Sequence, residues 1–190
     1  MRFSSRKLQR LVIVLALSLL GAVSVWTGPI DAGNPPATAA TGYRLVKVFD
    51  GDSMLMRSPE GSVIQVRIAG IDAPEKSQPF ADPARDRLAE LLQQDGLRVA
   101  ILKKDVYGRW LACLWIADQD LGLLMIEEGM VWFFRRYQSD LTKEQRLAYD
   151  AAEKSAQRAQ RGLWQEADPV PPWEFRQQKR EASRAEKQAR

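Results

Sequence analysis

The chain has 190 residues, of which 45% are hydrophobic and 27% are charged, a composition typical of one ordinary globular domain with extensions. It contains no histidine and a single cysteine, Cys113. The lack of histidine excludes Ser-His-Asp hydrolases, Cys-His proteases and the common zinc sites, so hydrolytic chemistry must use carboxylates, Arg, Lys, Tyr or a hard metal ion. Cys113 lies in the apolar run "LACLW", which predicts a small buried side chain rather than a reactive thiol.

Residues 1–24 have the pattern of a signal peptide or an N-terminal membrane anchor. Four cations and no acid occupy the first ten positions, and residues 11–25 are continuously apolar. This run of 15 residues is shorter than the roughly 20 that a spanning helix needs. Cleavage near Val25 would release a secreted or periplasmic protein. Without cleavage, residues 11–25 would tether the chain to a membrane, with Trp26 at the interface. We expect an exported protein in either case.

The net charge of +4 comes from the two ends of the chain. Residues 176–190 carry six cations and two acids, whereas residues 42–175 carry 18 cations and 21 acids. The pI of 9.3 therefore does not indicate a basic body that binds nucleic acid. Residues 25–42, rich in Pro, Gly, Ala and Thr, are predicted to form a linker, and residues 176–190 a charged C-terminal tail.

Residues 43–175 are predicted to form one domain, in which short strands precede and follow a helix. Strands are expected at residues 43–49, 53–58, 62–71, 97–104 and 110–117. Helices are expected at residues 82–96, 121–129 and 141–162. In the first helix, Asp82 is predicted to cap the N-terminus and Pro83 to fill the first position. The order predicts an α+β, mainly β fold: a five-stranded OB-type β-barrel packed with about three helices.

Acidic residues gather at two of the predicted turns. "FDGDS" places Asp50 and Asp52 between two strands, and "GIDAPE" places Asp72 and Glu75 just after a strand. Either segment alone is explained by turn chemistry, because Asp, Gly and Pro favour turns. Strand pairing would bring the two segments together, and their acids would then repel one another unless a cation lay among them. Asp52, Asp72 and the backbone carbonyl of Ala73 would form a partial oxygen shell suited to Ca²⁺.

Two arginines add the opposite charge. Arg67 precedes Asp72 by five residues, an odd spacing that points the two side chains to opposite faces of an ideal strand. We therefore expect a β-bulge at Ala69 and Gly70 that corrects the spacing. Arg109 lies in a further predicted turn, "DVYGR". A guanidinium matches phosphate oxygens with paired donors, although a surface ion pair is the alternative for each arginine.

Several of these segments, in this order and spacing, resemble the thermonuclease, or staphylococcal-nuclease-like, family over about residues 43–175. The segments that carry the resemblance are "VFDGDS", "VRIAGIDAPE", "DVYGR", "GMVWFFRRY", "RGLW" and "PVPPWEF". The resemblance implies an OB-type barrel with three helices. It also implies a Ca²⁺-dependent endonuclease that hydrolyses phosphodiester bonds of DNA and RNA with little sequence specificity, expected to act as a monomer.

The resemblance also assigns roles to individual residues. It implies that Asp52, Asp72 and the backbone carbonyl of Ala73 are metal ligands, with Asp50 as an outer-shell acid. It implies that Arg67 and Arg109 bind phosphate. Glu75 would be the general base, and Tyr107 would lie beside the phosphate. Calcium on a phosphate oxygen would neutralise charge, and Glu75 would take a proton from the attacking water.

The chain also departs from the family pattern. Ser53 stands where threonine is usual, and Val106 replaces a lysine beside the nucleotide pocket. The region of the base-stacking tyrosines holds Trp132, Phe133 and Phe134. These could stack bases, but core packing is an equal alternative for at least two of them. The departures bear on nucleotide preference rather than on hydrolysis.

Two other function classes remain open. The first is a catalytically inactive OB-type module that binds nucleic acid or protein. An inactive copy would be expected to lose Arg67, Glu75 or Arg109, and the chain keeps all three. The second is a membrane-tethered interaction protein built around the basic tail, which would explain the two ends of the chain but not the acids.

Overall fold

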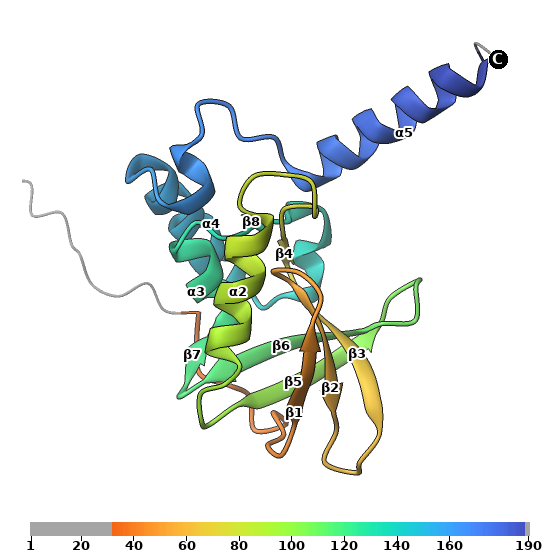
Figure 1. The fold of residues 1–190 in the computed structure, drawn as a ribbon. Helices are drawn as coiled ribbons and strands as arrows, with labels where there is room; N and C mark the ends of the chain where they lie inside the picture. The colour runs from red at the N-terminus through yellow and green to blue at the C-terminus, as the bar shows by residue number, and fades with distance from the viewer. Residues whose placement is uncertain (1–31, 189–190) are drawn as a thin grey trace, which may run out of the picture.

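The computed structural model describes residues 32–188. The predicted leader, the apolar run 11–25 and the first part of the predicted linker lie outside these residues. Across the described part of the chain, no helix is both long enough and apolar enough to cross a membrane. Figure 1 shows a curved sheet with helices packed at one end, and a long C-terminal helix that projects from the body.

Five strands form the main path of the sheet, as the sequence predicts. They are β1 (Arg44–Val48), β2 (Ser53–Arg57), β3 (Val63–Ile68), β5 (Arg98–Lys104) and β6 (Trp110–Ile116). Their order in space is β1-β2-β3-β6-β5, with the short β7 (Gln119–Asp120) paired to β6. The pairs β1–β2 and β2–β3 are antiparallel, so the first three strands form a meander, whereas β3 and β6 are parallel.

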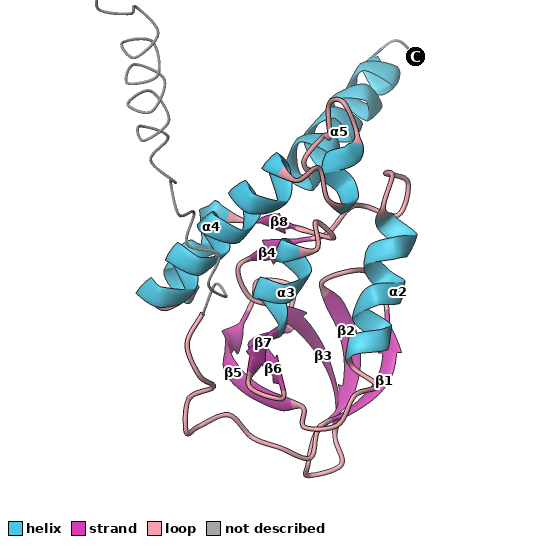
Figure 2. Ribbon diagram, turned by 90° about the vertical axis from the view of Figure 1, so that its left-hand side faces the viewer, coloured by secondary structure: helices cyan, strands magenta, loops and turns pink. Residues whose placement is uncertain are grey.

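The two ends of this path are joined by a single bridge. Ala40, just before β1, exchanges two backbone hydrogen bonds of 2.9 Å with Val99 of β5. Figure 2 shows the curvature of the sheet from the side. The arrangement confirms the predicted α+β fold of OB type.

The three predicted helices are present, with narrower bounds. They are α2 (Ala81–Leu91), α3 (Leu121–Glu127) and α4 (Lys143–Arg158). The predicted cap of α2 is wrong: Phe80 occupies the N-cap position with φ 64°, and Asp82 lies in the first turn. Gly162 does not end α4 but begins the short 3-10 helix η2 (Gly162–Gln165). A second 3-10 helix, η1 (Arg135–Asp140), precedes α4, and α5 (Pro172–Gln188) ends the described chain.

Cys113 lies in the core on β6, as predicted. Burial raises the pKa of its thiol to about 12, so the thiolate is scarce at neutral pH.

The predicted bulge at Ala69 and Gly70 is wrong, although its expected consequence is present. β3 ends at Ile68, and after a two-residue turn the chain enters β4 (Ile71–Asp72), which pairs with β8 (Trp132–Phe133) in a second small sheet. Gly70 has φ +74°, a conformation that L side chains rarely adopt, and a Cβ there would force the Leu141 side chain to shift. The turn, rather than a bulge, brings Asp72 to the side of the chain that Arg67 occupies.

Candidate functional site

Arg67 joins two predicted site acids that lie 20 residues apart in sequence. The register of β2 and β3 pairs Ser53 with Arg67, which places Asp52, the residue before β2, beside that arginine. Arg67 Nη1 donates to Asp52 Oδ1 at 2.5 Å, and Nη2 donates to Asp72 Oδ1 at 2.9 Å and to the Ile71 carbonyl at 3.1 Å. The guanidinium thus bridges the end of one strand pair to the start of the second sheet.

Both bridged carboxylates are almost fully buried. Asp52 is 2% exposed and Asp72 is 1% exposed. The second oxygen of Asp52 accepts from the Ala73 backbone N–H at 2.9 Å. Burial raises the pKa of Asp52 to about 7, with Arg67 acting in the opposite direction. Burial alone would lower the pKa of Arg67, but Asp52 and Asp72 raise it above its ordinary value. A buried carboxylate needs such donors or a bound cation to remain charged.

Asp50 shapes the turn in front of Asp52. Its Oδ1 accepts from the backbone N–H groups of Asp52 at 3.0 Å and Ser53 at 2.7 Å, and Ser53 Oγ donates to the same carboxylate at 2.8 Å. This is the local side-chain-to-backbone pattern by which Asp favours turns. Its contacts are those of turn chemistry, and an outer-shell role stays a prediction.

An arginine that sequence patterns place in the charged tail completes the site. Arg176 Nη1 donates to Glu75 Oε1 at 2.7 Å, and its Nη2 donates to Asp72 Oδ2 at 2.7 Å. Burial alone would lower the pKa of Arg176, but the hydrogen bonds to Asp72 and Glu75 raise it. We name Asp52, Arg67, Asp72, Glu75 and Arg176 the acid–arginine cluster. The predicted domain boundary after residue 175 falls inside α5, one residue before this contact.

A buried glutamine holds the loop that carries Glu75 against the segment that leads into α5. Gln78 Oε1 accepts from the Glu75 backbone N–H at 2.9 Å, and Gln78 Nε2 donates to the Val170 carbonyl at 2.7 Å. Trp173, in the first turn of α5, stacks on Phe134 with ring centroids 5.2 Å apart. These contacts fix the first turn of α5 and so place Arg176. Gln78 is missing from the predicted site, because its only signal in the sequence is a polar residue in a Pro-bounded turn.

The "DVYGR" turn holds its own arginine locally. Arg109 Nε and Nη2 both lie 2.8 Å from Asp105 Oδ2, and the Arg109 guanidinium carbon is 5.4 Å from the centre of the Tyr107 ring. Burial alone would raise the pKa of Asp105, but the Arg109 side chain and two backbone N–H groups lower it. Tyr107 is 82% exposed. The structure therefore pairs Arg109 with an acid of its own turn, and not with the acids of the cluster.

The topology nevertheless sets this turn beside the strand of Arg67. In the parallel pairing of β3 and β6, Arg67 stands opposite Leu111, and Arg109 comes two residues before Leu111. The turn thus leads directly into the strand that flanks the cluster.

The predicted aromatic region divides into core and surface residues. Trp132 and Phe133 are buried, and Phe133 packs edge-on against Tyr149 with centroids 5.7 Å apart. Phe134 is less buried and lines a surface pocket together with Phe133, Trp173 and the cations Arg135 and Arg136. Core packing is therefore confirmed for two of the three aromatics.

The chemistry of the cluster fits a hard divalent cation. Asp50, Asp52, Asp72 and Glu75 offer only oxygen donors, and two guanidiniums leave these four acids with net negative charge. Within residues 32–188, however, no group of at least three acidic or cysteine side chains is close enough together to hold a metal ion. The guanidiniums of Arg67 and Arg176 lie between the carboxylates instead. A cation at Asp72 would therefore have to displace Arg176 from one carboxylate oxygen.

Comparisons with known proteins agree with the geometry. The profile of the family described as "Staphylococcal nuclease homologue" matches residues 65–166. The chain is 36% identical over 137 residues to an "Uncharacterized endonuclease" of Haemophilus influenzae, covering 72% of this chain and 74% of that protein. It is 33% identical over 157 residues to a "Micrococcal nuclease" of Shigella flexneri, covering 78% and 87%. A probable staphylococcal-like nuclease of rice is 31% identical over 142 residues, covering 75% of this chain and 40% of the rice protein.

Proposed function

Because the chain belongs to the staphylococcal nuclease homologue family, we propose that it is a nuclease that hydrolyses phosphodiester bonds of DNA and RNA with little sequence specificity. The observation that carries the proposal is that Arg67 and Arg176 join Asp52, Asp72 and Glu75 into one hydrogen-bonded group. Calcium dependence is supported by the oxygen donors of this group. Export to the periplasm or the medium is supported by the pattern of residues 1–24.

The carboxylates of Asp52 and Asp72 would hold the cation, with the carbonyl of Ala73 beside them and Asp50 acting through water. A bound Ca²⁺ supplies charge neutralisation at a phosphate oxygen and orientation of a water molecule. Both aspartates are positioned for this by backbone pairing rather than by flexible loops, since Asp52 adjoins β2 and Asp72 belongs to β4. Their fixed positions reduce the reorganisation needed when substrate binds.

Arg67 would bind the scissile phosphate. Its three hydrogen bonds use only part of the five N–H donors of a guanidinium, so donors remain for phosphate oxygens. Because Asp52 and Asp72 hold the group in one orientation, little side-chain entropy is lost when phosphate binds.

Glu75 is the acid of the cluster that solvent can reach, with a side chain that is 37% exposed. It would accept a proton from the attacking water, a step typically worth about 10²–10⁴-fold in rate. The Glu75 backbone is held by Gln78, and its side chain is oriented by Arg176.

Arg109 and Tyr107 would act from the neighbouring turn. Arg109 exchanges Asp105 for a phosphate oxygen when substrate binds, and the exposed ring of Tyr107 lies beside the same phosphate. An arginine that leaves a partly exposed partner gives up little free energy, because such ion pairs are worth about 1 kcal/mol or less.

Cleavage of labelled single-stranded DNA by the purified full-length chain tests the proposal. We expect cleavage with calcium, none with chelator, and a rate lowered about 10²–10⁴-fold by Glu75→Gln. Glu60→Gln is the matched control, because Glu60 lies in the turn at the opposite end of β2 from Asp52, and it should cleave like the parent.

The outcomes separate the two function classes. Cleavage indifferent to chelator and to Glu75→Gln would exclude this mechanism. DNA binding without cleavage under any metal would instead assign the chain to the catalytically inactive binding modules.

A further inference from the structure

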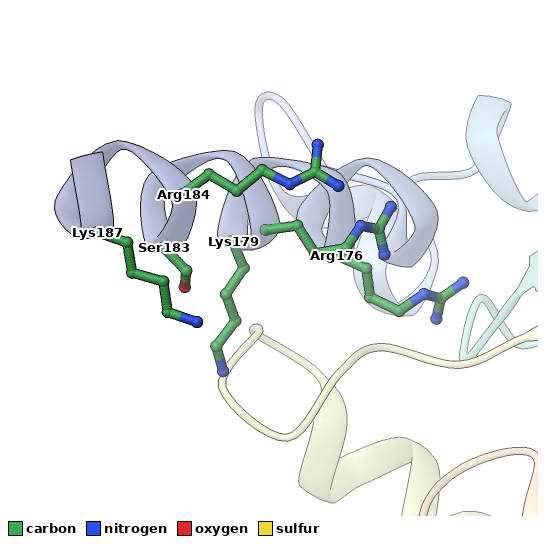
Figure 3. Close-up of a pocket in the computed structure, with 6 residues that line it drawn as sticks. Arg176, Lys179, Ser183, Arg184 and Lys187 are labelled. Atoms are coloured by element: carbon green, nitrogen blue, oxygen red, sulfur yellow. The ribbon is translucent and has the colours of Figure 1, made fainter.

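The exposed cations of α5 lie on one side of the helix and continue from the acid–arginine cluster. Their spacing of three and four residues is the spacing of one helix face. With Ser183 and the half-buried Arg176, they line a single surface pocket; the full set of cations is Arg176, Lys179, Arg180, Arg184 and Lys187. Figure 3 shows Arg176 at the end of this row nearest the domain body and Lys187 at the far end. We name these five cations the basic face of α5.

The two ends of α5 differ in their environment. Its first turn is docked, since Pro172 is buried and Trp173 stacks on Phe134. From Gln177 to the last described residue every side chain is exposed, and Figures 1 and 2 show this part projecting past the body. Packing against the domain therefore does not explain the arrangement of charges on the exposed part.

The charge pattern of α5 favours an anionic partner. Cations three and four residues apart repel each other and destabilise an isolated helix. Of the three acids of α5, Glu174 and Glu181 lie on the opposite face, where Glu181 accepts from Gln177 at 2.9 Å, and Glu186 lies at the edge of the basic face. The acids thus leave most of the repulsion on the basic face uncompensated, whereas a row of phosphates would neutralise it.

We propose that the basic face of α5 binds the phosphate backbone of the nucleic-acid strand as it leaves the active site. This inference rests on the proposed nuclease function, because the strand reaches α5 from the cluster. Arg176, which contacts Asp72 and Glu75, is the inner end of the surface and Lys187 its outer end. At about 1.5 Å per residue the surface is about 16 Å long, enough to contact several phosphates of a single strand.

The composition of α5 favours nucleic acid over a membrane surface as the partner. A helix that lies in a membrane interface buries a broad apolar face. Opposite its cations, the exposed part of α5 presents Gln177, Gln178 and Glu181, with alanine as its only apolar residue type. Such a helix is suited to backbone phosphates held by charge, and it offers nothing large to insert among acyl chains.

The test measures binding of a fluorescein-labelled 20-nucleotide single-stranded DNA to the full-length chain. Fluorescence anisotropy reports the binding at several salt concentrations, with chelator present to prevent cleavage. The variant is Arg180→Gln with Arg184→Gln. The matched control is Arg44→Gln with Arg57→Gln, an exposed pair that faces each other across β1 and β2. Both double variants remove two guanidiniums from exposed positions, so they change the net charge equally.

We expect the α5 variant to bind about tenfold more weakly at 0.1 M salt. The slope of log affinity against log salt should fall in magnitude by about 1.4, the release expected for two phosphate contacts with a single strand. The control should stay within about twofold of the parent. An α5 variant that binds like the parent, or a control that weakens equally, overturns the inference.

Two further arms distinguish a phosphate-binding surface from a lipid-binding one and from a failure of the nuclease function. Vesicles containing phosphatidylserine replace DNA in the first arm, and loss of vesicle binding with unchanged DNA affinity would assign the surface to lipid and overturn the inference. The second arm measures cleavage by the parent in calcium. DNA binding through α5 without cleavage refutes the nuclease function and keeps the surface, whereas cleavage with unchanged binding by the variant refutes the surface alone.

Discussion

The acid–arginine cluster and the Asp105–Arg109 turn both hold a guanidinium against carboxylate, yet they are built in different ways. The cluster takes its members from the turn before β2, from β3, β4, the following loop and α5, and its two aspartates are buried. The turn closes within five residues, and its tip is exposed. A local pair in partial solvent contributes little to stability, whereas breaking a buried pair leaves an uncompensated charge. The cluster is therefore tied to the fold, and the turn is free to exchange partners.

The largest expected effect is on stability, at Arg67. Arg67→Ala leaves Asp52 and Asp72 buried without their shared partner, so we expect a loss of about 3–5 kcal/mol in the free energy of unfolding. Arg109→Ala, the matched change in the turn, should cost less than about 1 kcal/mol. Urea unfolding followed by circular dichroism measures both. Equal losses would show that the two arginines do not differ as described.

The next effect is on catalysis, at Arg109. Removing one preorganised donor from the phosphate lowers kcat by about 10²–10³-fold, so Arg109→Ala should lose activity while its urea midpoint hardly moves. Arg57→Ala is the control, since Arg57 lies at the far end of β2 from Asp52. A kcat within twofold of the parent would remove Arg109 from the site and leave the turn a structural feature.

A smaller effect is expected at Gln78, which connects the Glu75 loop to the α5 segment. Gln78→Ala leaves the Glu75 N–H and the Val170 carbonyl without their partner, at a cost of about 1–3 kcal/mol. Hydrogen exchange should also become faster in the first turn of α5. Gln94→Ala, at an exposed position after α2, should change neither quantity. Unchanged exchange in α5 would mean that Trp173 alone docks the helix.

The smallest effect concerns competition within the cluster. Arg176 occupies Asp72 Oδ2, so Arg176→Gln should raise calcium affinity by about three- to tenfold, the equivalent of roughly 1 kcal/mol for a partly exposed pair. Isothermal titration calorimetry measures this directly, with Arg180→Gln as the control. Weaker calcium binding in Arg176→Gln would show that the guanidinium supports the metal site rather than competing with it.

The sequence predicts those members of the cluster that strand pairing brings together. Asp52, Arg67, Asp72 and Glu75 lie within one hairpin and its extension, where turns and register determine which side chains meet. The odd spacing of Arg67 and Asp72 is visible in the sequence, but periodicity alone cannot distinguish a bulge from a turn into another sheet. The Leu141 side chain occupies the space that a Cβ at position 70 would enter, and this packing joins segments that are distant in sequence.

Arg176 lies beyond what local patterns can show. It is 104 residues from Asp72 in sequence, and its position depends on the stacking of Trp173 on Phe134 and on the bridge from Gln78 to Val170. In the sequence it belongs to a run of charges that suits any solvated helix. The predicted cap of α2 is wrong because Phe80 adopts a left-handed conformation. That conformation favours glycine over aromatic residues, so local residue preferences do not predict it here.

The burial of Cys113 makes the chain suitable for site-specific labelling. Its thiol is the only one in the sequence, and with a pKa of about 12 it should react slowly with maleimides at neutral pH. A cysteine introduced at the exposed Ser183 would then carry a fluorophore midway along the projecting part of α5 without prior removal of the native residue. Quenching of such a dye by an acceptor on the DNA would report, in real time, which way a strand leaves the protein.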